Sequence, residues 1–146
     1  PGDAEAVTAA LHKAGVGALR DRRLSDLSGG QRQRAFIAMC LAQDTPVMLF
    51  DEPTSFLDIR YQVDTLDLLA ALAREGRTVV VVLHDIGQAA RYADHLVIMK
   101  DGRLRHAGPP EAVVTPDMLG EIYDISARVY PDPVSGAPQI SPEHRV

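Results

Sequence analysis

The chain has 146 residues, of which 46% are hydrophobic, and a formal net charge of −5. This length and composition suit a folded domain and argue against a disordered segment. The negative charge gives no general attraction to nucleic acid or to an anionic membrane surface, and the single cysteine excludes an intrachain disulfide. The five histidines show no ligand spacing, which argues against a structural metal site.

The first predicted element is a helix over residues 3–14, because apolar residues recur there at helical spacing. Asp3 is its expected N-cap, and Gly15 with Gly17 is expected to end it. Residues 18–27 read as a polar connection. Its arginines are interrupted by acidic residues, so we interpret them as a solvated cluster rather than a nucleic-acid site.

Residues 27–43, LSGGQRQRAFIAMCLAQ, predict a second helix, in which Ser28 is the N-cap and forms a capping box with Gln31. Gly29 and Gly30 each cost a helix about 1 kcal/mol relative to alanine, which makes sense where a group must approach the backbone closely. Bare N–H groups and a serine hydroxyl suit a phosphate; the alternative is that the glycines merely start a helix. The side chains expected in the core are Phe36, Met39, Cys40 and several alanines.

The central stretch is residues 47–58, VMLFDEPTSFLD. Its first four residues predict a strand buried on both faces, because a short unbroken apolar run suits a covered sheet. Asp51 and Glu52 follow at the carboxyl end, where ligands bind in open α/β sheets, and successive residues point in opposite directions. One acid can therefore hold a metal while the other faces a water, and Pro53 stiffens the turn. The alternative is an ordinary strand with an acidic turn.

A longer helix is predicted over residues 59–74, closed by Gly76. Residues 78–83, TVVVVL, predict a second buried strand, followed by His84 and Asp85. The side chains expected on the buried stripe of the helix are Ile59, Val63, Leu66, Leu69 and Leu72 or Ala73.

A further helix is expected from residue 86 to 92, and the strand–helix alternation predicts a parallel sheet with right-handed crossovers. A lone histidine after a strand is usually structural. Its place on the same edge as the acids makes His84 a candidate contact for a phosphate.

Asp101-Gly102 then predicts a type I′ hairpin within residues 95–107. The remaining expectations are short helices over 109–114 and 115–123, a short edge strand over 125–130, and an irregular, peripheral tail from Pro131.

Together these motifs resemble the second half of an ATP-binding cassette (ABC) ATPase, the nucleotide-binding subunit of an ABC transporter. The resemblance covers nearly the whole chain. Residues 27–31 match the signature motif, 47–52 the Walker B strand and the catalytic glutamate after it, 55–58 the D-loop, and His84 the switch histidine. The D-loop departs from its commoner form, which has Ala or Gly in place of Phe56.

The resemblance implies a role for each matching residue. Asp51 is expected to hold Mg²⁺, Glu52 to polarise the attacking water as general base, and His84 to contact the γ-phosphate of ATP. Asp58 is expected to communicate with the partner subunit. The signature residues expected to bind ATP held by the opposite subunit are Ser28, Gly29 and Gly30, with Gln31 beside them. The working unit is then a dimer with ATP at its interface.

One expected motif does not occur in these residues. The family requires a G-x-x-x-x-G-K-[ST] loop to hold the phosphates, and the two lysines, Lys13 and Lys100, follow His12 and Met99. The adenine-stacking aromatic residue and the Q-loop, which precede the signature in this family, are also not found. We therefore expect a truncated piece that does not hydrolyse ATP by itself and that self-associates through uncovered apolar surface.

The expected fold is α/β, a partial P-loop NTPase of the ABC ATPase type. It combines part of the helical subdomain with the C-terminal half of the RecA-like parallel-sheet core. The expected division is a helical-subdomain remnant over residues 1–43, the ATPase core over 44–130, and an irregular tail over 131–146.

Three stretches, residues 56–69, 83–104 and 108–138, resemble iron-siderophore importer ATPases, including the ferric enterobactin and ferric citrate types, with cobalamin and haem importers as close relatives. The implied partners are a second ATPase subunit, membrane permease subunits and, indirectly, a substrate-binding protein, with no nucleic acid. The implied location is the cytoplasmic face of the cell membrane. The partner proteins select the substrate. Two alternatives are a non-transport ABC ATPase of DNA repair or the ribosome, and an inactive interaction fragment.

Overall fold

The computed structural model describes residues 2–145 and divides the chain into two compact units, one ending at Val82 and the other beginning at Leu83. Each unit has its own hydrophobic core, so each is described by itself. The division at residues 43/44 and 130/131 stays a prediction, because it follows the subdomains of the resembled family and not the packing of this chain.

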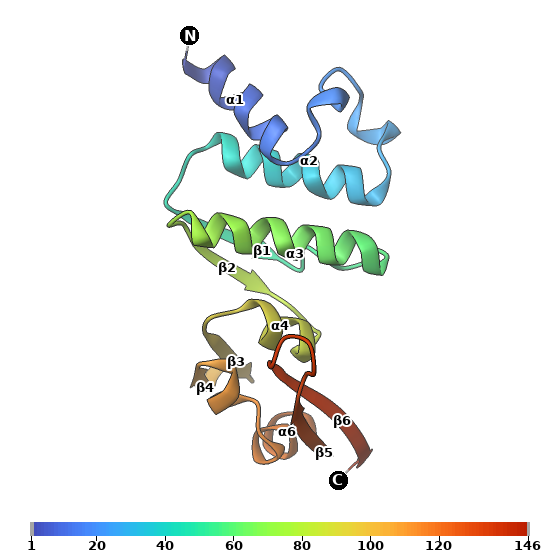
Figure 1. Ribbon diagram of the computed structural model, residues 1–146, viewed down its shortest axis with the longest axis vertical. Coiled ribbons are helices and arrows are strands. Elements are labelled where there is room, and N and C mark those ends of the chain that lie inside the picture. The colour runs from blue at the N-terminus through green and yellow to red at the C-terminus, as the bar shows by residue number, and fades with distance from the viewer. Residues whose placement is uncertain (1, 146) are drawn as a thin grey trace. The chain divides into compact units, whose positions relative to one another are not determined.

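The first unit combines helices with a two-stranded parallel sheet (Figure 1). Its core is formed by side chains of three helices and the first strand, among which Ile37 and Leu72 are fully buried. In chain order its elements are α1 (Gly2–Lys13), η1 (Gly17–Leu19), η2 (Leu24–Asp26), α2 (Gly29–Ala42), β1 (Val47–Asp51), α3 (Ile59–Arg74) and β2 (Thr78–Val82).

The helix α1 begins one residue earlier than predicted. It already includes Gly2, so Asp3 lies inside the first turn and not at the N-cap. An acidic side chain in that turn still interacts favourably with the helix dipole. Gly15 has a φ of +69°, the left-handed conformation that commonly ends a helix at glycine.

The strands β1 and β2 pair in parallel, as predicted, with Leu49 opposite Val80. The prediction that both strands are buried on two faces is wrong. Met48 and Phe50 point into the core, whereas Val47 and Leu49 are 48% and 73% exposed. The helices of this unit cover only one face of the sheet, and strand residues alternate between faces. The exposed apolar residues on the other face are Val47, Leu49, Val80 and Val82.

The predicted buried side of α2 is confirmed for Ala38, which is buried, and for Cys40, which is partly buried against the core, and it is wrong for Phe36 and Met39. Ile37, Ala38 and Leu41 are buried, while Phe36 and Met39 are 44% and 57% exposed. Apolar residues occur on both sides of this helix, so its sequence does not determine which side faces the core. Packing against α1 and β1 decides it.

The helix α3 has the predicted bounds, and its stripe is buried over the last three turns. Leu66, Leu69 and Leu72 lie in the interior. Ile59 and Val63, which we predicted to be core, are 78% and 43% exposed, because they lie at the helix start where no described element covers them. Gly76, at a φ of +95°, ends the helix as predicted.

The second unit is built from two antiparallel hairpins and three short helices. Its core side chains come from the helices and from the hairpin strands, with Leu119 and Met118 almost fully buried. Its elements are α4 (Ile86–Tyr92), β3 (Leu96–Lys100), β4 (Arg103–Gly108), α5 (Pro110–Val113), α6 (Pro116–Tyr123), β5 (Ile125–Pro131) and β6 (Pro138–Arg145).

Local signals in this unit are confirmed. Asp101 and Gly102 both have positive φ, +53° and +69°, as a type I′ turn between β3 and β4 requires. Thr115 caps α6 by accepting a hydrogen bond from the Met118 N–H at 3.1 Å. Proline occupies the first position of α5 and of α6.

The expectation of an irregular tail from Pro131 is wrong for residues 138–145. They form β6, which pairs antiparallel with β5, so Val129 lies opposite Ile140. Ile140 packs against the core of this unit. Pro133 and Gly136, with a φ of +75°, lie in the connection between the strands. Pro131 and Pro138 pair with each other where β5 ends and β6 begins, and Pro142 lies inside β6 opposite Ala127.

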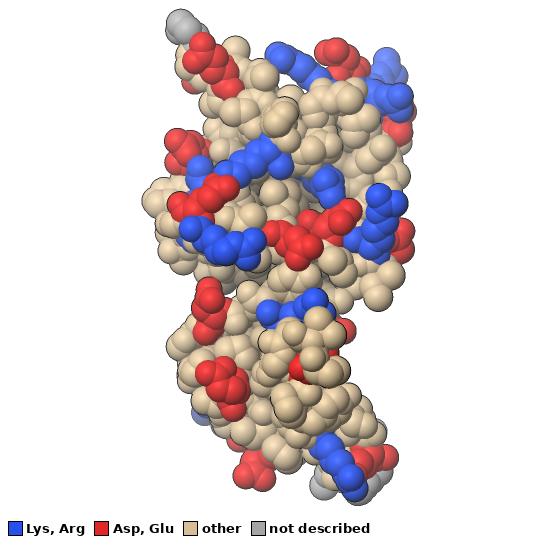
Figure 2. Space-filling view, in the orientation of Figure 1, with Lys and Arg blue, Asp and Glu red and all other residues tan. Residues whose placement is uncertain are grey.

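The charged side chains are mixed in sign. Figure 2 shows lysine and arginine interspersed with aspartate and glutamate over the visible face of the first unit. Some of them pair between elements, as Arg34 does with Asp64 at 3.0 Å and Arg77 with Asp44 at 2.7 Å. Lys13 also pairs with Glu75.

Candidate functional site

The start of α2 has the geometry predicted for the signature motif. The Ser28 Oγ accepts a hydrogen bond from the Gln31 N–H at 3.3 Å, and the Gln31 Oε1 accepts one from the Ser28 N–H at 3.1 Å. This reciprocal capping box satisfies two backbone donors. The Gln31 side chain is thus engaged by its own turn, while Ser28 and Gly29 are exposed and Gly30 is buried. We call residues 27–31 the signature turn.

The loop after β1 carries the two acids. Asp51 is the last residue of the strand and is exposed. Glu52 has a φ of +47°, so it has left the strand, although its N–H still donates to the Val82 carbonyl at 3.2 Å. The alternation of side chains along a strand therefore ends at Asp51. The Ser55 Oγ donates to the Glu52 Oε2 at 2.9 Å, and this turn orients the glutamate.

Asp58 has a structural role that our sequence reasoning missed. It is the N-cap of α3, and its Oδ1 accepts a hydrogen bond from the Tyr61 N–H at 3.1 Å. An aspartate directly before a helical pattern is a recognisable capping signal. The same loop lies beside the signature turn, because a Cβ on Gly29 would meet the Leu57 Cδ2 at 3.6 Å. The structure therefore brings the signature turn and residues 57–58 together in one unit.

His84 lies in the second unit, between the end of β2 and α4, and its side chain is exposed. The next residue, Asp85, caps α4 by accepting a hydrogen bond from the Gln88 N–H at 2.9 Å. The structure thus groups Asp51 and Glu52 in one unit with Ser28 and Asp58, and it places His84 in the other. The role of His84 stays a prediction.

The described residues fit a magnesium ion better than a metal held by protein alone. Within residues 2–145 no cluster of three or more His, Cys, Asp or Glu side chains can hold a metal ion. Magnesium is commonly bound through one or two carboxylates together with substrate phosphates and water, so the exposed Asp51 is a suitable ligand. The assignment of Asp51 to Mg²⁺ stays a prediction.

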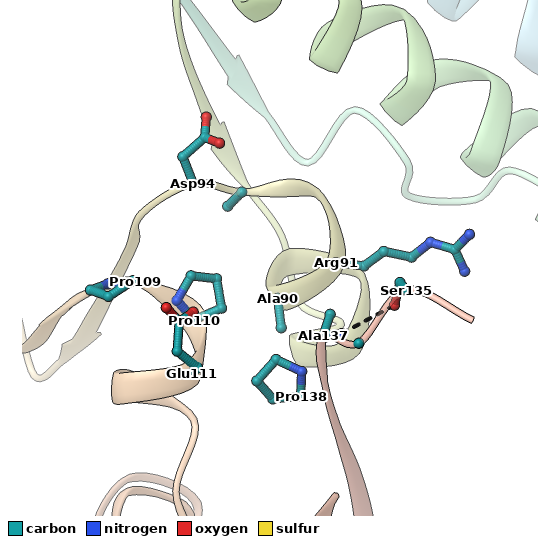
Figure 3. Close-up of a pocket in the computed structure, with 11 residues that line it drawn as sticks. Ala90, Arg91, Asp94, Pro109, Pro110, Glu111, Ser135, Ala137 and Pro138 are labelled. Carbon is teal, nitrogen blue, oxygen red and sulfur yellow. Dashed lines mark hydrogen bonds between the residues drawn. The ribbon is translucent and has the colours of Figure 1, made fainter. Parts of the chain in front are cut away.

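The second unit contains an open pocket of about 540 Å³. Figure 3 shows Ala90, Pro110 and Pro138 around it, with the Arg91 guanidinium directed away. The adjoining 132–136 turn is held by Asp132, whose pKa is lowered chiefly by hydrogen bonds from the N–H and the hydroxyl of Ser135 and then from the Val134 N–H. We assign this pocket no role.

Comparisons with known proteins place this geometry in a family. A family profile described as "ABC transporter" matches residues 2–55, which include the signature turn and both acids. The ferric enterobactin transport ATP-binding protein FepC of Escherichia coli K12 is 48% identical over 141 residues, which cover 96% of this chain and 52% of FepC. The chain belongs to the ABC transporter ATP-binding family. FepC is described as an ATP-binding protein, and membership of this family implies nucleotide binding.

Two further comparisons agree. The chain is 47% identical over 144 residues to the probable siderophore transport system ATP-binding protein YusV of Bacillus subtilis 168, covering 98% of this chain and 52% of YusV. A solved metal-chelate type ABC transporter in an inward-facing conformation superposes with a TM-score of 0.85 at 26% identity, covering 96% of this chain and 57% of that one. The predicted partial ABC ATPase fold is therefore confirmed. The chain spans about half the length of the curated relatives it matches.

None of the helices among the described residues has the length and apolar character needed to cross a membrane.

Proposed function

We propose that this chain is part of the ATP-hydrolysing subunit of an ABC importer for ferric siderophores. The observation that carries the proposal is the signature turn, formed as a complete capping box and packed against the loop that carries Asp51, Glu52 and Asp58. Support for the substrate class comes from FepC and YusV, whose names describe ferric enterobactin and siderophore transport. The proposed partners are a second ATPase subunit, membrane permease subunits and a substrate-binding protein, at the cytoplasmic face of the membrane.

The proposed chemistry depends on charge and on placement of water. Glu52, oriented by Ser55 at 2.9 Å, accepts the proton of the water that attacks the γ-phosphate. Asp51 is the proposed ligand of Mg²⁺, which neutralises phosphate charge when it is bound. Ser28 offers its hydroxyl and Gly29 its bare N–H to the phosphates of ATP held by the partner subunit, and Gly30, Gln31 and Asp58 complete this site. His84 is the proposed γ-phosphate contact.

We predict that Glu52→Gln, in a subunit of the relatives' full length containing these residues, lowers kcat for ATP by at least about 100-fold and preserves ATP binding. The amide keeps the size of the side chain and removes the general base, whose contribution is typically about 10²- to 10⁴-fold. The measurements are phosphate release and nucleotide affinity. Ser25→Ala, which changes an exposed hydroxyl outside the site, is the control. Normal turnover by Glu52→Gln would show that the catalytic assignment is wrong.

The 146-residue chain by itself provides a second test of the proposed ATPase chemistry. It contains no G-x-x-x-x-G-K-[ST] loop, so we expect no Mg-ATP turnover from it.

The substrate class is tested by uptake of ferric siderophore, haem and cobalamin in vesicles that hold the complete importer. Uptake of haem or cobalamin without ferric siderophore would overturn the substrate assignment.

A further inference from the structure

The two glycines of the signature turn have different surroundings. Gly29 is exposed, and a Cβ there would lie 3.6 Å from the Leu57 Cδ2, an ordinary contact distance. Gly30 is buried, and a Cβ there would lie 2.5 Å from Cδ1, 2.6 Å from Cγ and 2.9 Å from Cε1 of Tyr61. Cγ is the root of the ring, so a small movement of the ring tip does not relieve the clash. The Tyr61 ring occupies the space that a side chain at position 30 would need.

The backbone that carries the Tyr61 ring is fixed in the first turn of α3. The Tyr61 N–H donates to the Asp58 Oδ1 at 3.1 Å. One residue further, the Gln62 Nε2 donates to the Leu57 carbonyl at 2.9 Å and closes the same loop end. The N-terminal turn of α3 is therefore well defined, and the ring extends from it onto Gly30.

A second link joins the two helices one turn beyond this contact. Arg34 of α2 pairs with Asp64 of α3 at 3.0 Å, and both side chains are partly buried. Figure 1 shows the two helices running side by side in the first unit. The ring contact and the ion pair lie on the facing sides of α2 and α3. Together they set how the N-terminus of one helix lies relative to the N-terminus of the other.

We propose that Tyr61 is a positioning residue that sets the place of the signature turn relative to the loop of Asp51, Glu52 and Asp58. The inference rests on the proposed function, in which the signature turn and this loop contact nucleotide at a subunit interface. Gly30 lacks a side chain in order to seat the Tyr61 ring, while Gly29 is the glycine open to a phosphate.

The test is a double-mutant cycle in a subunit of the relatives' full length, with kcat and KM for ATP as the readouts. Gly30→Ala is expected to lower kcat at least about tenfold, because a displacement of about 1 Å costs up to about 10²-fold. In the Tyr61→Ala background the same change should cost less than about threefold, since the ring is gone. Equal losses in both backgrounds would overturn the proposal, because they would mean that a methyl at position 30 obstructs the nucleotide directly.

Two variants at position 61 separate positioning from general stability. Tyr61→Phe keeps the three ring carbons that face Gly30, so kcat should stay within about twofold of the parent. Tyr61→Ala should lower kcat at least about tenfold with KM changed less than about threefold, because the contact acts on orientation rather than on the first binding of ATP. A Tyr61→Phe variant as impaired as Tyr61→Ala would contradict the ring contact. Tyr130→Ala, which removes a half-exposed ring from β5, is the matched control.

A nucleotide-free readout distinguishes failure of this inference from failure of the proposed function. In the 146-residue chain, amide hydrogen exchange at Gln31, whose N–H is bonded to Ser28, should accelerate about tenfold in Tyr61→Ala and stay unchanged in Tyr61→Phe and Tyr130→Ala. Absence of ATP turnover in the full-length parent would overturn the proposed function, and the exchange rates would still decide whether Tyr61 holds the turn. Unchanged exchange in Tyr61→Ala would overturn the inference.

Discussion

The orientation of Glu52 depends on backbone geometry that strand periodicity does not describe. Glu52 and Phe56 have left-handed φ values of +47° and +62°, which cost non-glycine residues about 1–3 kcal/mol each. Hydrogen bonds within the turn offset part of this cost: the Ser55 N–H donates to the Glu52 carbonyl at 3.1 Å, and the Ser55 Oγ donates to the carboxylate. A strained residue at this position is typical of a functional loop, where orientation matters more than local stability.

The capping box gives a residue-scale prediction on stability. Ser28→Ala removes the acceptor for the Gln31 N–H and should lower the free energy of unfolding by about 1 kcal/mol. Urea unfolding followed by far-UV circular dichroism measures this change. Ser25→Ala is the control, because the Ser25 hydroxyl bonds only a neighbouring exposed carboxylate, Asp26, at 3.0 Å. Equal stability of Ser28→Ala and the parent would show that the cap does not contribute.

At the scale of elements, a helix or strand contributes to hydrophobic stability through the side that other elements cover. Leu72 of α3 is fully buried, whereas Leu49 of β1 is 73% exposed although it belongs to an equally apolar run. Hydrophobic stabilisation follows the apolar area removed from water and not the hydrophobicity of the residue. These two leucines therefore form a matched pair for measuring what the first unit's core contributes.

We expect Leu72→Ala to lower the free energy of unfolding by about 2–5 kcal/mol, because it removes buried methyl groups and leaves a cavity. Leu49→Ala should change it by less than about 0.5 kcal/mol. Both are measured by urea unfolding of the 146-residue chain, at concentrations below those at which we expect it to self-associate. Similar losses for the two variants would mean that the open face of the sheet is covered in solution.

The β5–β6 hairpin gives a prediction that depends on pH. The folded-state pKa of Asp132 is lowered from 3.8 by hydrogen bonds from Ser135 and Val134, so its stabilising contribution is complete above the ordinary value and is lost as pH falls through the lower folded-state value. Asp132→Ala should therefore lower Tm at about pH 7, and the difference from the parent should shrink as the pH falls below 3.8. Asp94→Ala controls for loss of one charge. A difference in Tm that grows on acidification would contradict this account.

At the scale of the whole molecule, the first unit presents an apolar sheet face. Val47 and Leu49 of β1 lie beside Val80 and Val82 of β2, and all four are about half exposed or more. An exposed apolar face bordered by unpaired strand edges favours association.

We predict that the 146-residue chain self-associates at micromolar concentration and that Leu49→Lys with Val80→Lys reduces this association. Two charges on the apolar face must be desolvated for the face to be covered, which is costly. Multi-angle light scattering measures the mass. Val97→Lys, at a 55% exposed valine of β3, is the matched control. A clean monomer of the parent chain, or an equal effect of Val97→Lys, would show that this face is not the contact.

Signals that act within a few residues of each other were enough to predict much of this protein from sequence. The capping box of Ser28, the bounds of α3 and α4, the type I′ turn at Asp101-Gly102 and the parallel pairing of β1 with β2 are all confirmed. Caps, turns and helical spacing depend on neighbouring residues, so they can be predicted from a short stretch of sequence. Each motif that marks the ABC ATPase family is likewise a short run of neighbouring residues, so it can be recognised in the sequence.

Only the tertiary structure decided which faces are buried and which distant residues meet. The buried side of α2, the open face of the sheet and the pairing of residues 138–145 with β5 depend on what packs against each element. The contact of Gly30 with Tyr61 joins residues 31 positions apart and has no local pattern. From sequence the glycines of the signature turn indicated a phosphate; the structure shows that Gly29 is exposed, while Gly30 packs against the Tyr61 ring, because side-chain packing is settled only when the chain has folded.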